Sequence, residues 1–349
     1  MSGRFSAVVM FGWVLALCGC SMLNAPNVSV IAVQPATSSE AARIKSIAVL
    51  PFEGTGGRDV AVEIEAILAS VKIADVPYFR VVERQRLDAV LKEIRLSQSG
   101  LVTSEQASRL GRLLGVQGIY VGTVAVPAVN HSYTQETRAV CAEQDTKKNF
   151  LGLPMCKRTV DSKVSCTRTE ASYVLIPKLI DVESGQIVFS NTYKESATAS
   201  SCSDSTTPAP VEGQLLEQAK STVLDRFRRA IAPSYARLNI QLMESDAGIG
   251  EDVAKRKLAQ GLEFAKANRL DRACELWREA GSSVERSVSL AYDLGICAEA
   301  GGDIRRAAEL YQQADLLLEK PDDRVSLALT RIEKAKADQA KFDRQRQTN

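Results

Sequence analysis

The sequence predicts an α/β domain followed by an all-α domain of repeated helices, with an export signal in front of both. Three observations lead to this expectation. Short β-branched runs alternate with amphipathic helical stretches over residues 44–243, a 34-residue internal repeat follows, and the first 19 residues have the layout of a signal peptide. A chain of 349 residues is long enough for two domains with cores of their own.

Residues 1–19 are expected to be a lipoprotein signal peptide. Arg4 supplies the positive start, and Phe5–Leu17 is an uncharged apolar run, shorter than the about 20 residues that a spanning helix needs. The run ends in Leu17-Cys18-Gly19-Cys20, which resembles a lipobox and places the acyl chains on Cys20. Ser21 resembles the residue found in lipoproteins sent to the outer membrane. An ordinary signal peptide with nearby cysteines is the alternative.

The α/β domain is expected at 44–243, after a flexible tether at 20–43 that is rich in Ser, Ala, Pro and Asn. Strands are predicted at 44–52, 79–83 and 116–126, with amphipathic helices between them. Thr103 and Gln106 form a capping box for one of these helices, and Gly115 ends it.

The second half of the α/β domain begins with a predicted hairpin, 173–182 and 186–193, around a short glycine-containing turn. A long helix at 211–231 and a closing edge strand at 237–242 follow. The polar segment 127–172 is an insertion in this unit. A structureless loop of that length would be unusual in a packed domain, so we expect disulfides or a β-hairpin excursion there.

Six cysteines remain after Cys20, an even number that favours disulfides in an oxidising compartment. Cys141, Cys156, Cys166 and Cys202 are expected to form two bridges that hold the insertion, with three connectivities open. Zinc is a weaker alternative because CxxC spacing is missing. Cys274 and Cys297 could form a third bridge or stay as two buried thiols.

Residues 245–346 contain the internal repeat, and its 34-residue period is the length of a tetratricopeptide (TPR) unit. Small and aromatic residues recur at TPR spacing, where they let paired helices approach closely. The expected packing positions are Gly261, Ala273, Trp277, Ala280, Gly295, Ala307, Tyr311 and Ala314. Two copies are fewer than an array usually needs, so flanking helices at 245–257 and 324–346 are expected to cap it, with the charged end fraying into solvent.

Four stretches of the α/β part resemble the CsgG-type family of outer-membrane lipoproteins that act in curli secretion. They are IAVLPFEGTGG, FRVVERQRLDAVLKEIRLSQSGLV, ASRLGRLLGVQGIYVGTV and LIDVESGQIVFS. The resemblance covers about residues 44–232 and implies a mixed sheet with covering helices. For the curli member it implies a ring of subunits with membrane-inserted hairpins, and for other relatives soluble lipoproteins that bind partner proteins.

Composition and motifs argue against several functions. Basic and acidic residues number 44 and 42, which gives no broad positive field for nucleic acid. The single histidine, His131, cannot support an HExxH or Ser/His/Asp arrangement, and GxSxG does not occur. We therefore expect no catalytic residue, no metal and no cofactor.

The sequence thus favours an outer-membrane-anchored periplasmic lipoprotein that binds or assembles other envelope proteins through its TPR face and α/β domain. The N-terminal lipid would contact the membrane, and a homo-oligomer is possible on the family resemblance. The alternative is a CsgG-like oligomeric secretion channel. Its membrane hairpins would need alternating apolar residues, whereas RTVDSKVSCTRTE and KESATASSCSDSTTPAP present mainly Thr, Ser and charged residues.

Overall fold

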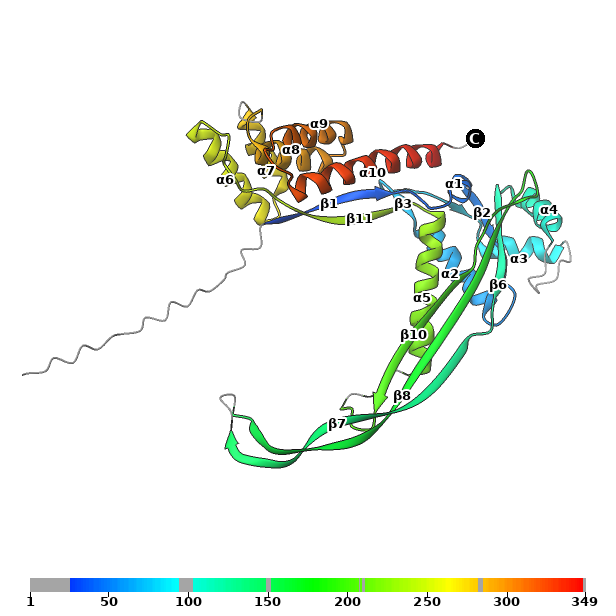
Figure 1. The fold of residues 1–349 in the computed structure, drawn as a ribbon. Coiled ribbons are helices and arrows are strands. Elements are labelled where there is room, and N and C mark those ends of the chain that lie inside the picture. Colours follow the sequence, from blue (N-terminus) through cyan, green and yellow to red (C-terminus); the bar gives the residue numbers. More distant parts are fainter. Residues whose placement is uncertain are drawn as a thin grey trace, which may run out of the picture. The chain divides into compact units, whose positions relative to one another are not determined.

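The computed structural model describes residues 26–93, 103–148, 152–206, 208, 211–281 and 285–347. The chain divides into two compact units. Within the described residues, the α/β unit extends over 32–236 together with 334–347, and the helical unit over 26–31 together with 237–333. This is the predicted order, a mixed α/β part followed by several helices (Figure 1).

A curled mixed sheet forms the centre of the α/β unit, with strand order β10-β8-β6-β2-β5. β2 runs parallel to both β5 and β6, whereas β8 is antiparallel to β6. β7 and β9 also pair with β8. The strands are β2 (Ser46–Val49), β5 (Arg80–Val81), β6 (Gly118–Val124), β7 (Ala128–Lys148), β8 (Pro154–Asp181), β9 (Ile187–Ser190) and β10 (Tyr193–Cys202).

Helices cover both faces of this sheet, which explains why its inner strands are apolar at consecutive positions. Ile47 and Val49 of β2 face a core that also contains residues of α2 and α5, whereas Ala48 faces a second core with residues of α3 and α4. The helices are α1 (Ser39–Arg43), α2 (Gly57–Ser70), α3 (Arg84–Glu93), α4 (Ser104–Leu114) and α5 (Glu212–Ile231).

Local sequence signals set the ends of these helices. The capping box of α4 is confirmed, since Gln106 N donates to Thr103 Oγ1 at 3.2 Å and Thr103 N to Gln106 Oε1 at 3.0 Å. Gly115 ends the helix with a φ of +68°. Before α2, a Cβ on Gly57 would lie 2.0 Å from the carbonyl oxygen of Phe52, so only glycine fits this strand-to-helix turn.

Two short sheets and five more helices complete the described elements. The sheets pair β1 (Asn27–Gln34) with β11 (Ser234–Gln241), and β3 (Lys72–Ile73) with β4 (Val76–Pro77). The helices are α6 (Asp252–Lys266), α7 (Leu270–Glu279), α8 (Val288–Ala300), α9 (Ile304–Leu316) and α10 (Asp323–Arg346). α6 packs on α7, and α8 packs on α9.

The expected tether at 20–43 is wrong from residue 27 onward, because β1 and α1 lie there. Val28 and Val30 are buried on one face of β1, a short alternation that the polar composition of the segment obscures. The predicted edge strand at 237–242 pairs with β1 and does not close the main sheet. Residues 20–25 lie outside the described part of the chain.

The boundaries expected for the helical domain also need correction. A separate capping helix at 245–257 is not present, because that stretch leads into α6, the first helix of the repeat. At the other end, residues 334–346 belong to the α/β unit and do not fray. Phe342 and Gln345 are buried there, three residues apart on one side of α10.

Gln345 fastens the end of α10 to the chain before α1. Its side-chain amide pairs with both backbone groups of Ala36: Ala36 N donates to Oε1 at 3.0 Å, and Nε2 donates to Ala36 O at 2.8 Å. Lys341 Nζ donates to Thr37 O at 2.8 Å on the same side. Because buried backbone groups need partners, Gln345 supplies what a neighbouring strand would otherwise provide.

Candidate interaction surfaces

The insertion at 127–172 is a long β-hairpin, as one of the two expectations proposed. We call residues 128–148 of β7 and 154–172 of β8 the ribbon. The two strands pair antiparallel from Ala128 opposite Ser172 to Lys148 opposite Pro154, with register irregularities after Cys141. Figure 1 shows the ribbon continuing from the sheet of the α/β unit.

β10 lies beside the inner part of the ribbon as a third strand, whereas the outer part consists of β7 and β8 alone. β10 pairs with β8 from Tyr193 opposite Leu175 to Cys202 opposite Cys166, and its pairing ends there. Beyond that point no other strand of the described residues pairs with either side. The outer edges of β7 and β10 therefore present backbone N–H and C=O groups that a partner strand could use.

The two faces of the outer ribbon bury little apolar surface. Val160 is paired with Val140, and Val164 is buried on the same face. The opposite face includes Lys163 opposite Thr137, both exposed. Two-stranded ribbons with so little buried surface are marginal in water on their own, so other interactions must hold this one.

One disulfide lies within the ribbon, and a second joins the ribbon to β10. Cys141 is joined to Cys156 between β7 and β8, with Cα atoms 5.6 Å apart. Cys166 is joined to Cys202 between β8 and β10, with Cα atoms 3.9 Å apart. The structure thus contains one of the three connectivities left open by the sequence, and the second bridge fastens the ribbon to the hairpin region.

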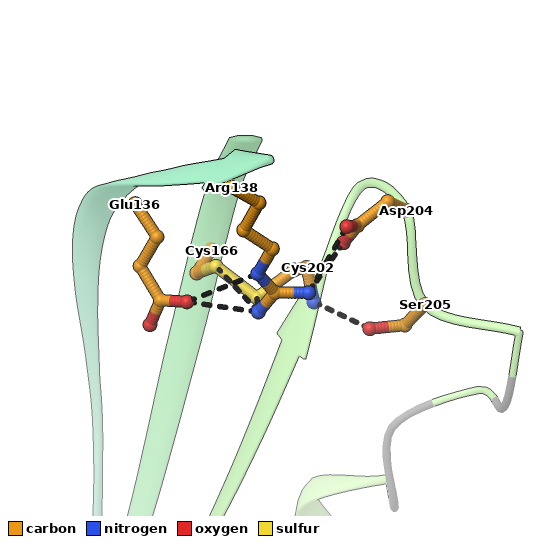
Figure 2. Close-up of a disulfide and its surroundings, with 6 residues drawn as sticks. All are labelled: Glu136, Arg138, Cys166, Cys202, Asp204 and Ser205. Atoms are coloured by element: carbon orange, nitrogen blue, oxygen red, sulfur yellow. Dashed lines mark hydrogen bonds and ion pairs between the residues drawn. A yellow bond between two sulfur atoms is a disulfide. The ribbon is translucent and has the colours of Figure 1, made fainter. Parts of the chain in front are cut away.

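Arg138 lies over the Cys166–Cys202 bridge and joins two carboxylates there (Figure 2). Its Nη1 donates to both carboxylate oxygens of Asp204 at 3.0 Å, and its Nη2 donates to Glu136 Oε2 at 2.8 Å. Nη2 also lies 3.1 Å from Cys202 Sγ. Sequence reasoning missed this cluster, although Glu136 and Arg138 share one face of a strand by their spacing of two.

Glu136, Cys166 and Cys202 bring three potential metal ligands within 4.8 Å of one another. Both sulfur atoms are in a disulfide, and the guanidinium of Arg138 occupies the space between them and the carboxylate. Metal ligation by cysteine requires the thiolate. The donor set therefore suits a cationic side chain rather than a metal ion.

His131 connects the base of the ribbon to α5. Its Nδ1 lies 3.1 Å from Thr169 Oγ1, and its Nε2 lies 3.2 Å from Glu212 Oε1 at the start of α5. The imidazole is partly exposed. Both of its nitrogens thus contact groups that position the strand.

In the helical unit, equivalent positions of the two repeat copies make equivalent contacts. A Cβ on Gly261 would lie 2.1 Å from Trp277 Nε1, and a Cβ on Gly295 would lie 2.4 Å from Tyr311 Cε1. Each glycine lets the aromatic ring of the next helix rest on its backbone. The four repeat alanines are buried as well: Ala273, Ala280, Ala307 and Ala314.

A disulfide between Cys274 of α7 and Cys297 of α8 links the two copies, with Cα atoms 5.8 Å apart. A cleft of about 660 Å³ lies beside it. Leu294 and Leu310 contribute apolar surface to this cleft, and Arg278 and Arg306 are among its charged residues. We call it the helical groove.

Among the described residues, no helix combines the length and the apolar character needed to cross a membrane. Cys20, the expected lipid-modified residue, lies outside the described part of the chain.

A family model described as "Curli production assembly/transport component CsgG" matches residues 28–232, more than half of the chain. No match was found among curated proteins. Three solved structures are similar. The C-terminal domain of LpoB from Salmonella enterica has 14% identity and a TM-score of 0.23, with coverage of 43% of this chain and 81% of that one.

The second is lipoprotein GNA1162 from Neisseria meningitidis, with 16% identity, a TM-score of 0.23 and coverage of 52% and 97% of the two chains. The third is a dodecamer of a PelC variant from Paraburkholderia phytofirmans, with 17% identity, a TM-score of 0.22 and coverage of 59% and 99%.

Proposed function

The chain belongs to the CsgG family, and from this premise we propose that it is a lipid-anchored periplasmic protein of the outer membrane that binds and assembles other envelope proteins. Lipid on Cys20 holds it to the membrane, and it carries out no catalysis. The helical unit acts as a TPR-like binding array, which the two equivalent glycine–aromatic contacts support.

The ribbon is the observation that carries this proposal. Its free strand edges can pair with an added strand, whereas its exposed side chains are largely polar on both faces. Neither face carries a continuous apolar stripe, because one presents Thr137 and Lys163, and the other places Glu136 and Arg138 beside Val140. A protein partner in water fits both properties, and the helical groove offers a second binding surface.

A secretion channel is the second candidate, and one observation favours it. β7 and β10 flank β8 on opposite sides, so β10 of one copy could pair with β7 of the next and build a ring. Such a ring would be a detergent-resistant oligomer of defined mass. A purified full chain that stays monomeric in detergent would remove this candidate.

Photo-crosslinking in intact cells separates the two candidates. A photoreactive amino acid replaces Tyr133 on the ribbon or Arg306 at the helical groove, and Val62 of α2, which is 50% exposed, serves as control. A binding module gives crosslinks to another envelope protein from the first two positions and none from the control. Crosslinks from Tyr133 to acyl chains or to a second copy alone would favour the channel, and no crosslinks from either position would contradict both.

Lipid attachment is tested separately with Cys20→Ala. Labelling with radioactive palmitate should be lost, and the variant should leave the outer-membrane fraction. An unlabelled parent protein, together with a variant that stays in that fraction, would show that the anchor is wrongly assigned.

A further inference from the structure

A cleft of about 900 Å³ lies in the α/β unit, and none of its lining residues belongs to the ribbon or to the helical groove. It is bordered by the start of β2, the β3–β4 hairpin and the end of α10. Its cationic residues are Lys45, Arg80 and Arg346, and none of its lining residues is acidic. We call it the basic cleft.

Neutral groups hold the basic residues in place. Lys45 Nζ donates to Gln345 O at 2.9 Å and to Ala42 O, and it lies 3.4 Å from the centre of the Tyr78 ring. Arg80 Nη2 donates to Ser46 Oγ at 3.2 Å. Gln345 thus has two roles. Its side chain joins the end of α10 to Ala36, and its backbone carbonyl holds Lys45 in the cleft.

Within the described part of the chain, the positive charge of the cleft is not balanced by a paired carboxylate. Among the described residues, Lys45, Arg80 and Arg346 form no ion pair. Burial, together with the nearby Arg346, lowers the pKa of Lys45 to about 7. Bringing like charges together without a counter-charge costs free energy that a bound anion would recover.

One wall of the cleft is apolar. Ile73, Val76 and Pro77 come from the β3–β4 hairpin, and Phe79 follows it. Val76 is 64% exposed, so its side chain is accessible to a ligand. An apolar wall next to unpaired cations suits a ligand that has both an anionic head and an apolar body.

We propose that the basic cleft binds a phosphate group carried on an apolar body. Two guanidinium groups match phosphate oxygens through forked hydrogen bonds, and Gln117, whose Oε1 accepts from Lys45 N and Ser46 N, still has its amide donors available. A phosphate of charge near −2 balances the cleft better than a single carboxylate. This site is independent of the proposed partner binding.

Calorimetric titration of the purified full chain in detergent tests the site, with inorganic phosphate and short-chain dihexanoyl phosphatidic acid as probes. Dihexanoyl phosphatidylcholine, titrated in parallel, corrects for uptake by the micelles. We expect both phosphate probes to bind, the lipid more tightly. Arg80→Ala and Arg346→Ala should each weaken binding about 10- to 100-fold, because each removes a charge-assisted hydrogen bond.

Arg109→Ala is the matched control, since Arg109 is an exposed arginine of α4 that does not line the cleft. Equal loss of binding in this variant would overturn the site, and so would no binding by the parent protein. If inorganic phosphate binds as tightly as the lipid, the apolar body is wrong and a free phosphate is the ligand. Near-ultraviolet circular dichroism confirms that the variants remain folded.

Discussion

The helical unit and the ribbon contain the same kind of cross-link but depend on it differently. Trp277 and Tyr311 are fully buried against glycines, so the Cys274–Cys297 bridge reinforces an existing core. In the outer ribbon, Val164 is buried and almost all other described side chains are not. This region is held by the Cys141–Cys156 bridge and by the bridge to β10 instead of by a packed core. Disulfides thus replace packing in one region and supplement it in the other.

The largest effect should come from removing an aromatic residue of the helical unit. Trp277→Ala leaves a cavity beside Gly261 and breaks the bond from Nε1 to Leu258 O, so the free energy of unfolding of this unit should fall by about 3–5 kcal/mol. Chemical denaturation measures the loss. Leu316→Ala, at an 86% exposed position, is the control and should change little. A similar loss in both variants would show that the core is not organised around the repeat.

The ribbon should respond most to loss of its inner bridge. Replacing Cys166 and Cys202 by Ser should destabilise the pairing of β8 with the end of β10 by about 2–4 kcal/mol, because no other disulfide of the described residues joins these two strands. Hydrogen exchange should speed up over 197–202 and over the paired residues 166–171 of β8, and stay slow in α6–α9.

The same replacement at Cys274 and Cys297 provides the matched comparison. That variant should unfold more easily overall, but its helices should remain protected in the native state, because the glycine–aromatic contacts persist. Local opening at α7 and α8 equal to that of the ribbon would contradict the distinction. Thiol counting on the denatured, unreduced parent should find none of the six cysteines reactive.

A smaller effect is expected from a single buried hydroxyl. Tyr311 OH donates to Glu299 Oε2 at 2.7 Å and accepts from Arg331 Nη2 at 3.2 Å. Tyr311→Phe should therefore cost about 1–2 kcal/mol of unfolding free energy. Tyr133→Phe on the ribbon, where the side chain is 78% exposed, should cost nothing measurable. An equal loss in both would mean that the hydroxyl of Tyr311 is not part of a buried network.

The smallest effect concerns pH. Asp293 is fully buried, its Oδ1 accepts from Met243 N at 3.0 Å, and burial raises the pKa of its carboxyl well above 3.8. As the pH rises above about 4, the unfolded chain ionises first, so the unit loses stability with rising pH. Asp293→Asn abolishes this titration.

The variant should melt on the order of 2–4 °C above the parent protein at pH 7 and at the same temperature near pH 4. Melting curves measured across this range by circular dichroism provide the check. A gain that is constant with pH would show that Asp293 is not the titrating group.

Patterns within one element predicted most of the fold. The buried runs of β2 and β6 and the capping box of α4 depend on neighbouring residues, and they were confirmed. The resemblance to the CsgG family was confirmed over residues 28–232. The TPR assignment remains a prediction, supported by the contacts of Gly261 and Gly295.

Features that depend on distant partners were missed. The burial of Gln345 follows from its pairing with Ala36, and nothing in the charged sequence around it indicates that partner. The choice among cysteine pairings depends on strand register, which places Cys202 directly opposite Cys166. Arg138 reaches Asp204 across three strands, so sequence spacing could not reveal that contact.

The bond between Ala36 and Gln345 joins residues 309 positions apart, and this sets a time order for the chain. Ala36 emerges early during synthesis, yet Gln345 follows only after the ribbon and the helical unit have been synthesised. Until then the backbone groups of Ala36 lack the side chain of Gln345, and the basic cleft lacks Arg346. A chain broken off in the helical unit would retain every strand of the main sheet and still expose this segment to proteases.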